Sequence, residues 1–334
     1  MKVARGRPGA GGLTFGLGGP WLNEVIDETG RQVLKGVSRS FYLTLRMLPV
    51  PMRGAASLGY LLARTSDTLA DSAKAPYEAR LQFLDQFGVA VSGDRDAPRW
   101  PVSILNSVPD ARERNLLEGS ADLIAWLRKL PAGEAQLVRE VVEIIIGGQR
   151  LDLKRFADAR REHPVALSDD AALEDYAWRV AGCVGAFWTK LGFLTLGDRF
   201  SISTEADLLE RGIAFGKGLQ LVNILRDVGE DLACGRCYLP VANPHDRVAL
   251  LECHARWLAR TIDWVREGER YAATLKSRRL RAATALPALI AKKTVESMAG
   301  ATWDRLHTRI KVPRSFVYLS LFRAFTTAPG SMSR

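Results

Sequence analysis

The segment Gly218–Asp231, GLQLVNILRDVGED, with its continuation Gly235–Pro240, GRCYLP, decides the fold of this chain. Read with a helical period, it places polar side chains on one face and aliphatic side chains on the other. The polar face consists of Gln220, Asn223, Asp227, Glu230 and Asp231. Carboxylates one turn apart repel each other by about 0.2–0.5 kcal/mol, so this face needs a compensating cation. Mg²⁺ prefers carboxylate oxygens and often bridges to substrate phosphates, which makes it the obvious candidate.

The alternative for this segment alone is an ordinary solvated helix face. In that case Arg226 pairs with Glu230 one turn later and offsets part of the repulsion. Nothing within the segment decides between a solvated face and a metal site, because isolated motifs of this kind often occur by chance.

A second segment favours the metal site. Gly59–Asp71, GYLLARTSDTLAD, carries a polar stripe on an otherwise apolar or small-residue helix. The stripe consists of Tyr60, Arg64, Asp67 and Asp71, which are spaced to share one helix face. Charged side chains are rarely buried without partners, so such a stripe should face a cavity. Two such helices facing each other would hold Mg²⁺ ions between them, and the ions would hold a diphosphate.

Composition narrows the class of protein. The chain has 334 residues, a net charge of +10 and 47% hydrophobic residues, which indicates a globular protein with a large core. The excess of basic residues is suited to binding nucleic acid, an anionic membrane surface or acidic small molecules. No nucleic-acid-binding motif accompanies the charge, so no nucleic-acid partner is expected.

The ends of the chain and its cysteines yield further expectations. Residues 1–20 are Gly-rich and basic without an apolar signal core, and we expect a disordered leader followed by a domain over residues 21–330. No apolar run approaches the ~20 residues of a membrane span. The Cys234-x-x-Cys237 pair has no second pair at zinc-ligand spacing, so reduced thiols are expected.

The hydrophobic pattern predicts helices throughout and no alternating strand pair. Proline, glycine and capping residues bound them. The expected helices cover residues 21–48, 52–71, 77–91, 111–130, 134–156, a segment after Ser168 or Asp169, 206–232, 246–276, 280–300 and 311–327. The fold class predicted from this pattern is all-α, a single helical bundle around a central cavity.

Four blocks in this order resemble squalene/phytoene synthases. They are Ser38-Arg39-Ser40-Phe41, the Tyr60 to Asp71 stripe, Tyr176-x-x-x-Val180-Ala181-Gly182-x-Val184-Gly185, and Gln220 to Pro240. The resemblance covers nearly all of the chain after the leader. It implies an isoprenoid-synthase-type bundle, Mg²⁺ dependence and head-to-head condensation of two prenyl diphosphates.

The resemblance also implies residue roles. The metal ligands would be Asp67, Asp71, Asn223, Asp227, Glu230 and Asp231. The diphosphate-binding residues would be Ser38, Arg39, Ser40, Arg64, Arg226 and Arg236. The substrate pocket would include Phe41, Val180, Ala181, Gly182, Gln220, Leu221 and Asn223. Tyr176 and Tyr60 would join the four aspartates as catalytic residues, although Tyr176 also suits a packed aromatic position.

The product remains open within the family. The Asp67-Thr68-x-x-Asp71 core resembles the squalene synthase version more than the phytoene version. The resemblance therefore favours conversion of farnesyl diphosphate through presqualene diphosphate to squalene, with NADPH as reductant. The alternatives are a presqualene diphosphate, hydroxysqualene, dehydrosqualene or phytoene synthase without NADPH, and a non-catalytic lipid-binding or assembly protein.

The place of the protein in the cell is a further expectation. The last apolar run, Ser315–Phe322, is too short and too close to Arg314 and Arg323 to span a membrane. We expect a cytoplasmic protein whose basic surface rests peripherally on the anionic inner face of a membrane. The oligomeric state is not indicated by the sequence.

Overall fold

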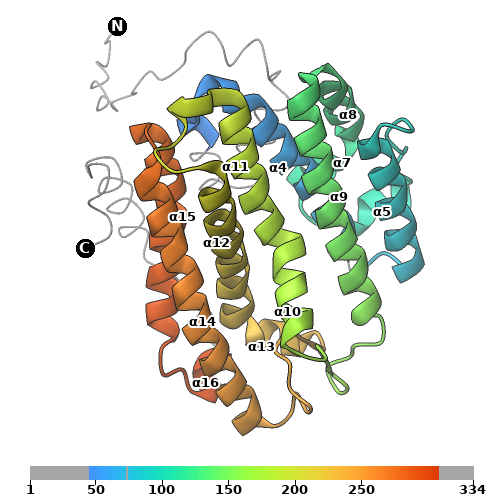
Figure 1. Cartoon of the computed structure of the whole chain (residues 1–334). Helices are drawn as coiled ribbons and strands as arrows, with labels where there is room; N and C mark the ends of the chain where they lie inside the picture. Colours follow the sequence, from blue (N-terminus) through green and yellow to red (C-terminus); the bar gives the residue numbers. More distant parts are fainter. Residues whose placement is uncertain (1–44, 73, 308–334) are drawn as a thin grey trace, which may run out of the picture.

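A computed structural model describes residues 45–72 and 74–307 as a bundle of helices (Figure 1). The expected leader and the helices expected over 21–48 and 311–327 lie almost wholly outside these residues. The helices are α4 (Val50–Ala70), α5 (Tyr77–Ser92), α6 (Val102–Ser107), α7 (Ala111–Glu118), α8 (Ser120–Lys129), α9 (Ala132–Arg155), α10 (Asp170–Ala177), the π-helical turn η1 (Trp178–Gly182), α11 (Cys183–Leu196), the 3₁₀ turn η2 (Gly197–Arg199), α12 (Glu205–Arg226), α13 (Val228–Ala233), α14 (Arg247–Thr274), α15 (Arg278–Met298) and α16 (Trp303–Leu306). This architecture confirms the all-α prediction.

Local sequence sets most helix starts. Pro49, Pro76, Pro101 and Pro131 immediately precede α4, α5, α6 and α9. Proline restricts the backbone to a helix-compatible φ and lacks an N–H that would go unpaired in the first turn. Side chains cap other starts: Asp169 accepts a hydrogen bond from the Ala172 N–H, and Asp246 caps α14.

Two helix breaks and one pair of strands differ from the expectation. The helix expected over residues 111–130 is broken at Gly119 into α7 and α8. The helix expected over 206–232 is broken at Asp227, whose φ of −101° and ψ of 12° separate α12 from α13. Two short strands, β1 (Val165–Ala166) and β2 (Arg236–Cys237), pair in parallel where no strand was expected. The two strands place Arg236 beside the segment that leads into α10.

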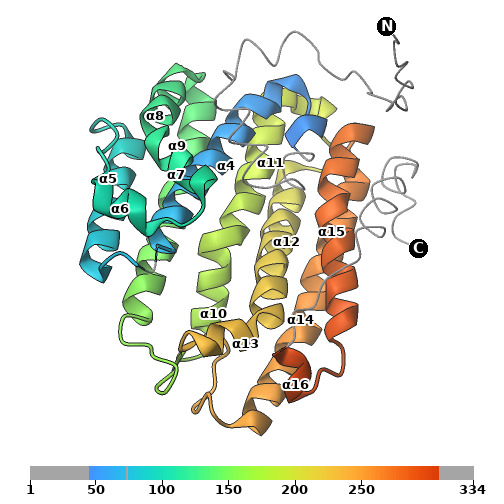
Figure 2. The ribbon, with the colours of Figure 1, turned by 180° about the vertical axis from the view of Figure 1, so that it is seen from behind.

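The core forms two packed groups of helices. One apolar cluster joins α4, α5, α8, α9 and α11, and the other joins α10, α12, α13, α14 and α15. α11 and α12 connect the two groups across a close seam (Figures 1 and 2). A Cβ on Gly185 would lie 1.8 Å from the Gly212 carbonyl oxygen, so no larger residue fits there. The small residues of this block therefore serve helix packing.

One continuous helical segment, Asp170–Arg199, is long and apolar enough to cross a membrane by length and composition, with a mean hydropathy of 1.3. This differs from the expectation that no apolar run approaches that length. In the fold the segment packs between α9 and α12. It is apolar on two sides because part of it also lines the pocket described below.

Candidate active site

The polar stripe of α4 is the first half of the site. Tyr60, Arg64, Asp67 and Asp71 lie on the part of the helix that the core leaves uncovered, whereas the residues between them are largely buried. Asp71 ends the helix, and its backbone N–H bonds to the Asp67 carbonyl oxygen at 2.8 Å. The helical spacing predicted from sequence is therefore present, and both carboxylates are at the end of α4.

Asp67 is held by one residue from α9 and one from its own helix. The Gln149 amide of α9 donates a hydrogen bond to Asp67, and the Arg64 guanidinium lies 3.7 Å from its carboxylate. Arg64 itself binds Glu113 of α7. The Asp67 side chain keeps 43% of its surface exposed, yet protein atoms surround its remaining sides. This partial burial raises the pKa of Asp67 to about 6, and the nearby Asp71 charge adds to the shift.

Asp227 stands at the break between α12 and α13. Arg226 donates to both of its carboxylate oxygens, at 2.7 and 2.5 Å. This bidentate pair replaces the Arg226–Glu230 pair that the sequence alternative invoked. Because the helix breaks at Asp227, Asp231 follows on α13 with its side chain only 18% exposed.

Asp231 is the more perturbed carboxyl group of this half. The Arg236 guanidinium lies 3.4 Å from it. Burial raises the pKa of Asp231 to about 7; Arg236 opposes the shift, and the negative charges of Asp227, Asp152 and Glu230 add to it. Arg236 is fixed by Gly235, whose φ of +83° and contact with the Arg160 backbone exclude a side chain.

A fifth carboxylate, Asp152 of α9, lies between the two halves. It accepts a hydrogen bond from the Tyr238 hydroxyl at 2.9 Å, and Tyr238 stacks on Tyr176 with ring centroids 4.9 Å apart. Burial raises the pKa of Asp152 to about 6; Tyr238 and Arg236 oppose this shift, and Asp71 adds to it. These electrostatic contacts show that the ends of α4, α9 and α13 face one another.

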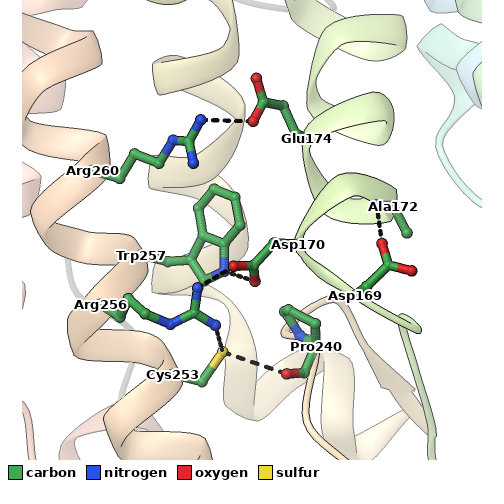
Figure 3. Close-up of polar contacts among 9 residues, drawn as sticks. All are labelled: Asp169, Asp170, Ala172, Glu174, Pro240, Cys253, Arg256, Trp257 and Arg260. Carbon is green, nitrogen blue, oxygen red and sulfur yellow. Dashed lines mark hydrogen bonds and ion pairs between the residues drawn. The ribbon is translucent and has the colours of Figure 1, made fainter.

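Tyr176 is buried, and the helix that carries it is anchored to α14 (Figure 3). Asp170 in the first turn of α10 accepts hydrogen bonds from Arg256 and from the Trp257 indole N–H, the latter at 3.1 Å. Glu174 one turn later binds Arg260 at 2.7 Å. This clamp fixes α10 over the body of the bundle and with it the ring of Tyr176.

The residues fit a divalent cation, although they do not form a complete cage. Among residues 45–72 and 74–307, no three acidic, imidazole or thiol groups converge closely enough to bind a metal alone. Buried oxygens nevertheless lack partners, namely Oδ1 of Asp152 and Oε1 of Gln149. Burial raises the pKa values of Asp67 and Asp231, so a bound cation would stabilise the ionised form of both carboxylates. This donor set suits Mg²⁺, which keeps several waters and completes its shell with substrate phosphates.

An apolar pocket of about 190 Å³ lies between α11, α12 and α15. Its wall is formed by Val180, Ala181, Val184, Gly185, Trp188, Gly212, Phe215, Gly216, Leu219, Tyr271, Ala283, Thr284 and Pro287. Val180 and Ala181 were predicted as wall residues. Its wall includes residues of η1, which follows α10 and Tyr176, and of α12, which ends at the Asp227 break.

Other predicted site residues have different places. Gly182 is buried in the seam, where a Cβ would approach Lys217 and Trp178. Leu221 is completely buried in the core and is absent from the wall of this pocket. Gln220 is half-buried, and Asn223 and Glu230 are exposed. Ser38, Arg39, Ser40 and Phe41 lie outside the described residues.

Sequence reasoning gave no role to Asp152, Gln149 or Glu113. Gln149 and Asp152 lie three residues apart on α9, and this spacing places them on one face. Glu113 gave no signal, because its contact with Arg64 joins residues 49 positions apart. The sequence feature that could have indicated Asp152 is a charged residue on a mostly apolar helix.

Facing carboxylates at one end of a helical bundle, next to an apolar pocket, define an isoprenoid-synthase-type protein. The profile of the squalene/phytoene synthase family matches residues 34–315, and the chain belongs to that family. Members of the family are prenyltransferases, which confirms the predicted enzyme class.

Individual relatives agree with this assignment. The presqualene diphosphate synthase of Zymomonas mobilis is 28% identical over 261 residues, which are 76% of this chain and 76% of that protein. The presqualene diphosphate synthase of Rhodopseudomonas palustris is 33% identical over 201 residues, which are 60% of this chain and 58% of that protein. The solved complex of TcSQS with the ligand E5700 has the same fold, with a TM-score of 0.73, 24% identity, and coverage of 90% of this chain and 87% of that one.

Proposed function

We propose that this protein catalyses the Mg²⁺-dependent head-to-head condensation of two farnesyl diphosphates to presqualene diphosphate. The carrying observation is the convergence of the aspartates of α4 and α12–α13, with Arg236 and Asp152 between them. The two bacterial relatives named presqualene diphosphate synthases support this product.

The carboxylates and arginines would act on the diphosphate groups. Asp67, Asp71, Asp227 and Asp231 would hold Mg²⁺, which neutralises a leaving diphosphate when bound. Arg236 already lies beside Asp231, and its planar fork suits bidentate contact with phosphate oxygens. Cleavage of the allylic C–O bond then gives a carbocation, and the diphosphate takes the electron pair.

The pocket and the tyrosines would act on the carbon skeleton. The apolar walls exclude water that would otherwise quench the carbocation. The alkene of the second substrate attacks the cation, and loss of one proton closes the cyclopropane ring. Burial raises the pKa of Tyr176 well above its usual value, so this residue offers the cation a neutral ring and hydroxyl. Asp152 accepts a hydrogen bond from Tyr238, whose ring stacks on Tyr176. It would be the nearby carboxylate that accepts the released proton.

Squalene is the second candidate product. The Asp67-Thr68-x-x-Asp71 core favours it, since this version of the motif is the one that resembles squalene synthases. Its formation needs a second ionisation and a hydride from NADPH. The use of NADPH stays a prediction.

Product analysis by mass spectrometry tests both candidates. Purified protein is incubated with farnesyl diphosphate and Mg²⁺, with and without NADPH. Presqualene diphosphate as the product in both incubations is the expected result, and squalene that requires NADPH would establish the second candidate. A hydroxylated C30 alcohol or dehydrosqualene would assign a sister activity on the same site. Absence of product with both farnesyl and geranylgeranyl diphosphate would overturn the enzymatic proposal.

A further inference from the structure

The end of the bundle opposite the carboxylates has a distinct surface. It is built from the start of α4, the end of α11 with η2, and the turn between α14 and α15, which lie together at the upper end in Figures 1 and 2. Backbone hydrogen bonds join the last two parts: the Lys276 N–H donates to the Phe200 carbonyl, and the Ile202 N–H to the Thr274 carbonyl, both at 3.0 Å. The segment after η2 and the turn between α14 and α15 are therefore fixed to each other.

This end is basic. Arg199, Lys276, Arg278 and Arg279 are all exposed there. Within residues 45–72 and 74–307, neither Arg278 nor Arg279 forms an ion pair with a carboxylate. Arg279 instead faces another guanidinium, that of Arg53, whose pKa is lowered by burial and then by its like-charged neighbours. Repulsion between like charges at this surface costs free energy, and an anionic partner of Arg278 and Arg279 would offset that cost.

A buried arginine fixes the geometry of the turn. Arg281 is only 2% exposed and donates to the carbonyl oxygens of Leu275 and Lys276, at 2.6 and 3.1 Å. It thereby ties the end of α14 to the first turn of α15. Arg278 and Arg279 are the first two residues of α15, so their side chains project from an ordered backbone.

Large apolar side chains project from the same end. Val50 at the start of α4 is 56% exposed, Leu194 near the end of α11 is 53% exposed, and Ile202 after η2 is 69% exposed. Exposed apolar side chains between basic residues are typical of surfaces that lie at the boundary between lipid headgroups and acyl chains.

Part of the wall of the apolar pocket comes from helix turns that adjoin this surface. Ala283 and Thr284 of its wall follow Arg279 by about one turn on α15, and Trp188 precedes Leu194 on α11. The carboxylates are at the other end of α4. Since α4 has 21 residues, they are about 30 Å from the basic surface, several times the Debye length of about 8 Å at physiological salt. The acidic end would therefore not weaken attraction of the basic end to an anionic surface.

We propose that this basic, apolar end, defined by Val50, Leu194, Arg199, Ile202, Lys276, Arg278 and Arg279, docks on an anionic lipid bilayer. Charge complementarity favours that partner, because each lysine or arginine near anionic headgroups strengthens binding to the bilayer. The pocket would then lie directly behind the membrane contact, and an apolar product would leave into lipid. The exit route rests on the proposed function, whereas the docking itself does not.

Sedimentation with vesicles tests the docking without using enzyme activity. The full chain is mixed with vesicles of phosphatidylcholine alone or with 30% phosphatidylglycerol, a probe composition of about one anionic lipid in three. Wild-type protein should bind the anionic vesicles, and binding should fall as salt is raised. The double variant Arg278→Glu, Arg279→Glu should lower the partition coefficient at least tenfold. Acidic residues are favourable in the first turn of a helix, so these changes should leave α15 folded.

A matched charge reversal at the opposite end serves as the control. Lys154→Glu with Arg161→Glu alters two exposed cations near the end of α9 and should bind anionic vesicles within about twofold of wild type. Ile202→Ser with Leu194→Ser should weaken binding several-fold, and Val248→Ser should not. Equal binding by the Arg278/Arg279 variant and its control, or no preference for anionic vesicles, would overturn the proposal.

A second copy of the chain is the competing occupant of this surface. Sedimentation velocity without lipid distinguishes it: a dimer that the Arg278/Arg279 variant dissociates would assign the surface to self-association and overturn membrane docking. The condensation rate of the same variant in detergent should equal that of wild type. A chain that binds vesicles as described but yields no product would leave docking established and remove the proposed function alone.

Discussion

The two aspartate pairs of the site have the same spacing but different surroundings. On α4 the helix continues unbroken to Asp71, and Asp67 is held by a neutral amide and a distant guanidinium. On α12–α13 the helix breaks at Asp227, and both carboxylate oxygens are already paired with Arg226. Asp67 is thus open to a cation, whereas Asp227 is already paired with an arginine. We therefore expect Mg²⁺ to bind first at the α4 pair, and binding at Asp227 to require that Arg226 move to a diphosphate.

The largest expected effect comes from removing one carboxylate of each pair. Asp67→Asn and Asp227→Asn should each lower turnover by at least about 10²–10³-fold, the cost typical of losing preorganised electrostatic stabilisation. Steady-state kinetics with farnesyl diphosphate would measure this, with circular dichroism to verify the fold. Asp122→Asn on exposed α8 is the control and should leave turnover unchanged. Near-normal turnover in Asp227→Asn would remove the second pair from the metal site.

The internal pairing of Asp227 can be broken directly. Arg226→Gln should increase the affinity for Mg²⁺ alone several-fold, because it frees a carboxylate, and should raise the KM for farnesyl diphosphate because a phosphate ligand is lost. Arg64→Gln should change the affinity for Mg²⁺ less, since Arg64 binds chiefly Glu113. Isothermal titration with Mg²⁺ would compare the two. An equal effect of both substitutions would show that the two pairs do not differ.

The two pairs should also differ in their dependence on pH. Mg²⁺ binding must displace the proton from Asp67 below about pH 6 and from Asp231 below about pH 7. Affinity for Mg²⁺ should therefore rise with pH in two steps. Asp231→Asn should retain only the lower step and Asp67→Asn only the upper one.

The same raised pKa values affect the metal-free protein. Between about pH 4, where an unfolded aspartate ionises, and the folded values, the native state binds more protons than the unfolded state. These two groups therefore lower the free energy of unfolding as pH rises through this window. Asp67→Asn and Asp231→Asn should raise the Tm more at pH 8 than at pH 5, relative to wild type. A constant difference across pH would contradict the shifts.

The smallest expected effect concerns the amide that holds Asp67. Gln149→Met keeps a similar volume on α9 but removes the hydrogen bond to Asp67. Loss of one such bond should weaken Mg²⁺ binding by about twofold, the low end of a single hydrogen bond's net contribution, and leave the Asp227 side unaffected. Titration of this variant alone and combined with Arg226→Gln would show whether the two effects are independent.

Sequence predicted the helices and the two polar stripes well, because periodicity reports which face of a helix is apolar. It could not predict the break at Asp227, since Val228 and Leu232 continue the apolar pattern of α12 past the break. Asp152 and Glu113 join the site through contacts between distant segments, and such contacts leave no trace in local spacing. Gly182 and Leu221 are apolar or small like true wall residues, and only packing shows that they face the seam and the core.

The π-helical turn η1 sets the angular register of the segment on which Tyr176 lies. Such a turn holds one residue more than an α-helical turn, and each residue advances an α-helix by about 100°. Deleting a single residue within Trp178–Gly182 would let the helix run regularly and would rotate Tyr176 by that angle against α11. The Tyr176 ring would lose its stacking contact with Tyr238, while Gly185 could still pack against Gly212. Loss of one residue in this turn would therefore separate the two tyrosine rings while the bundle keeps its helices.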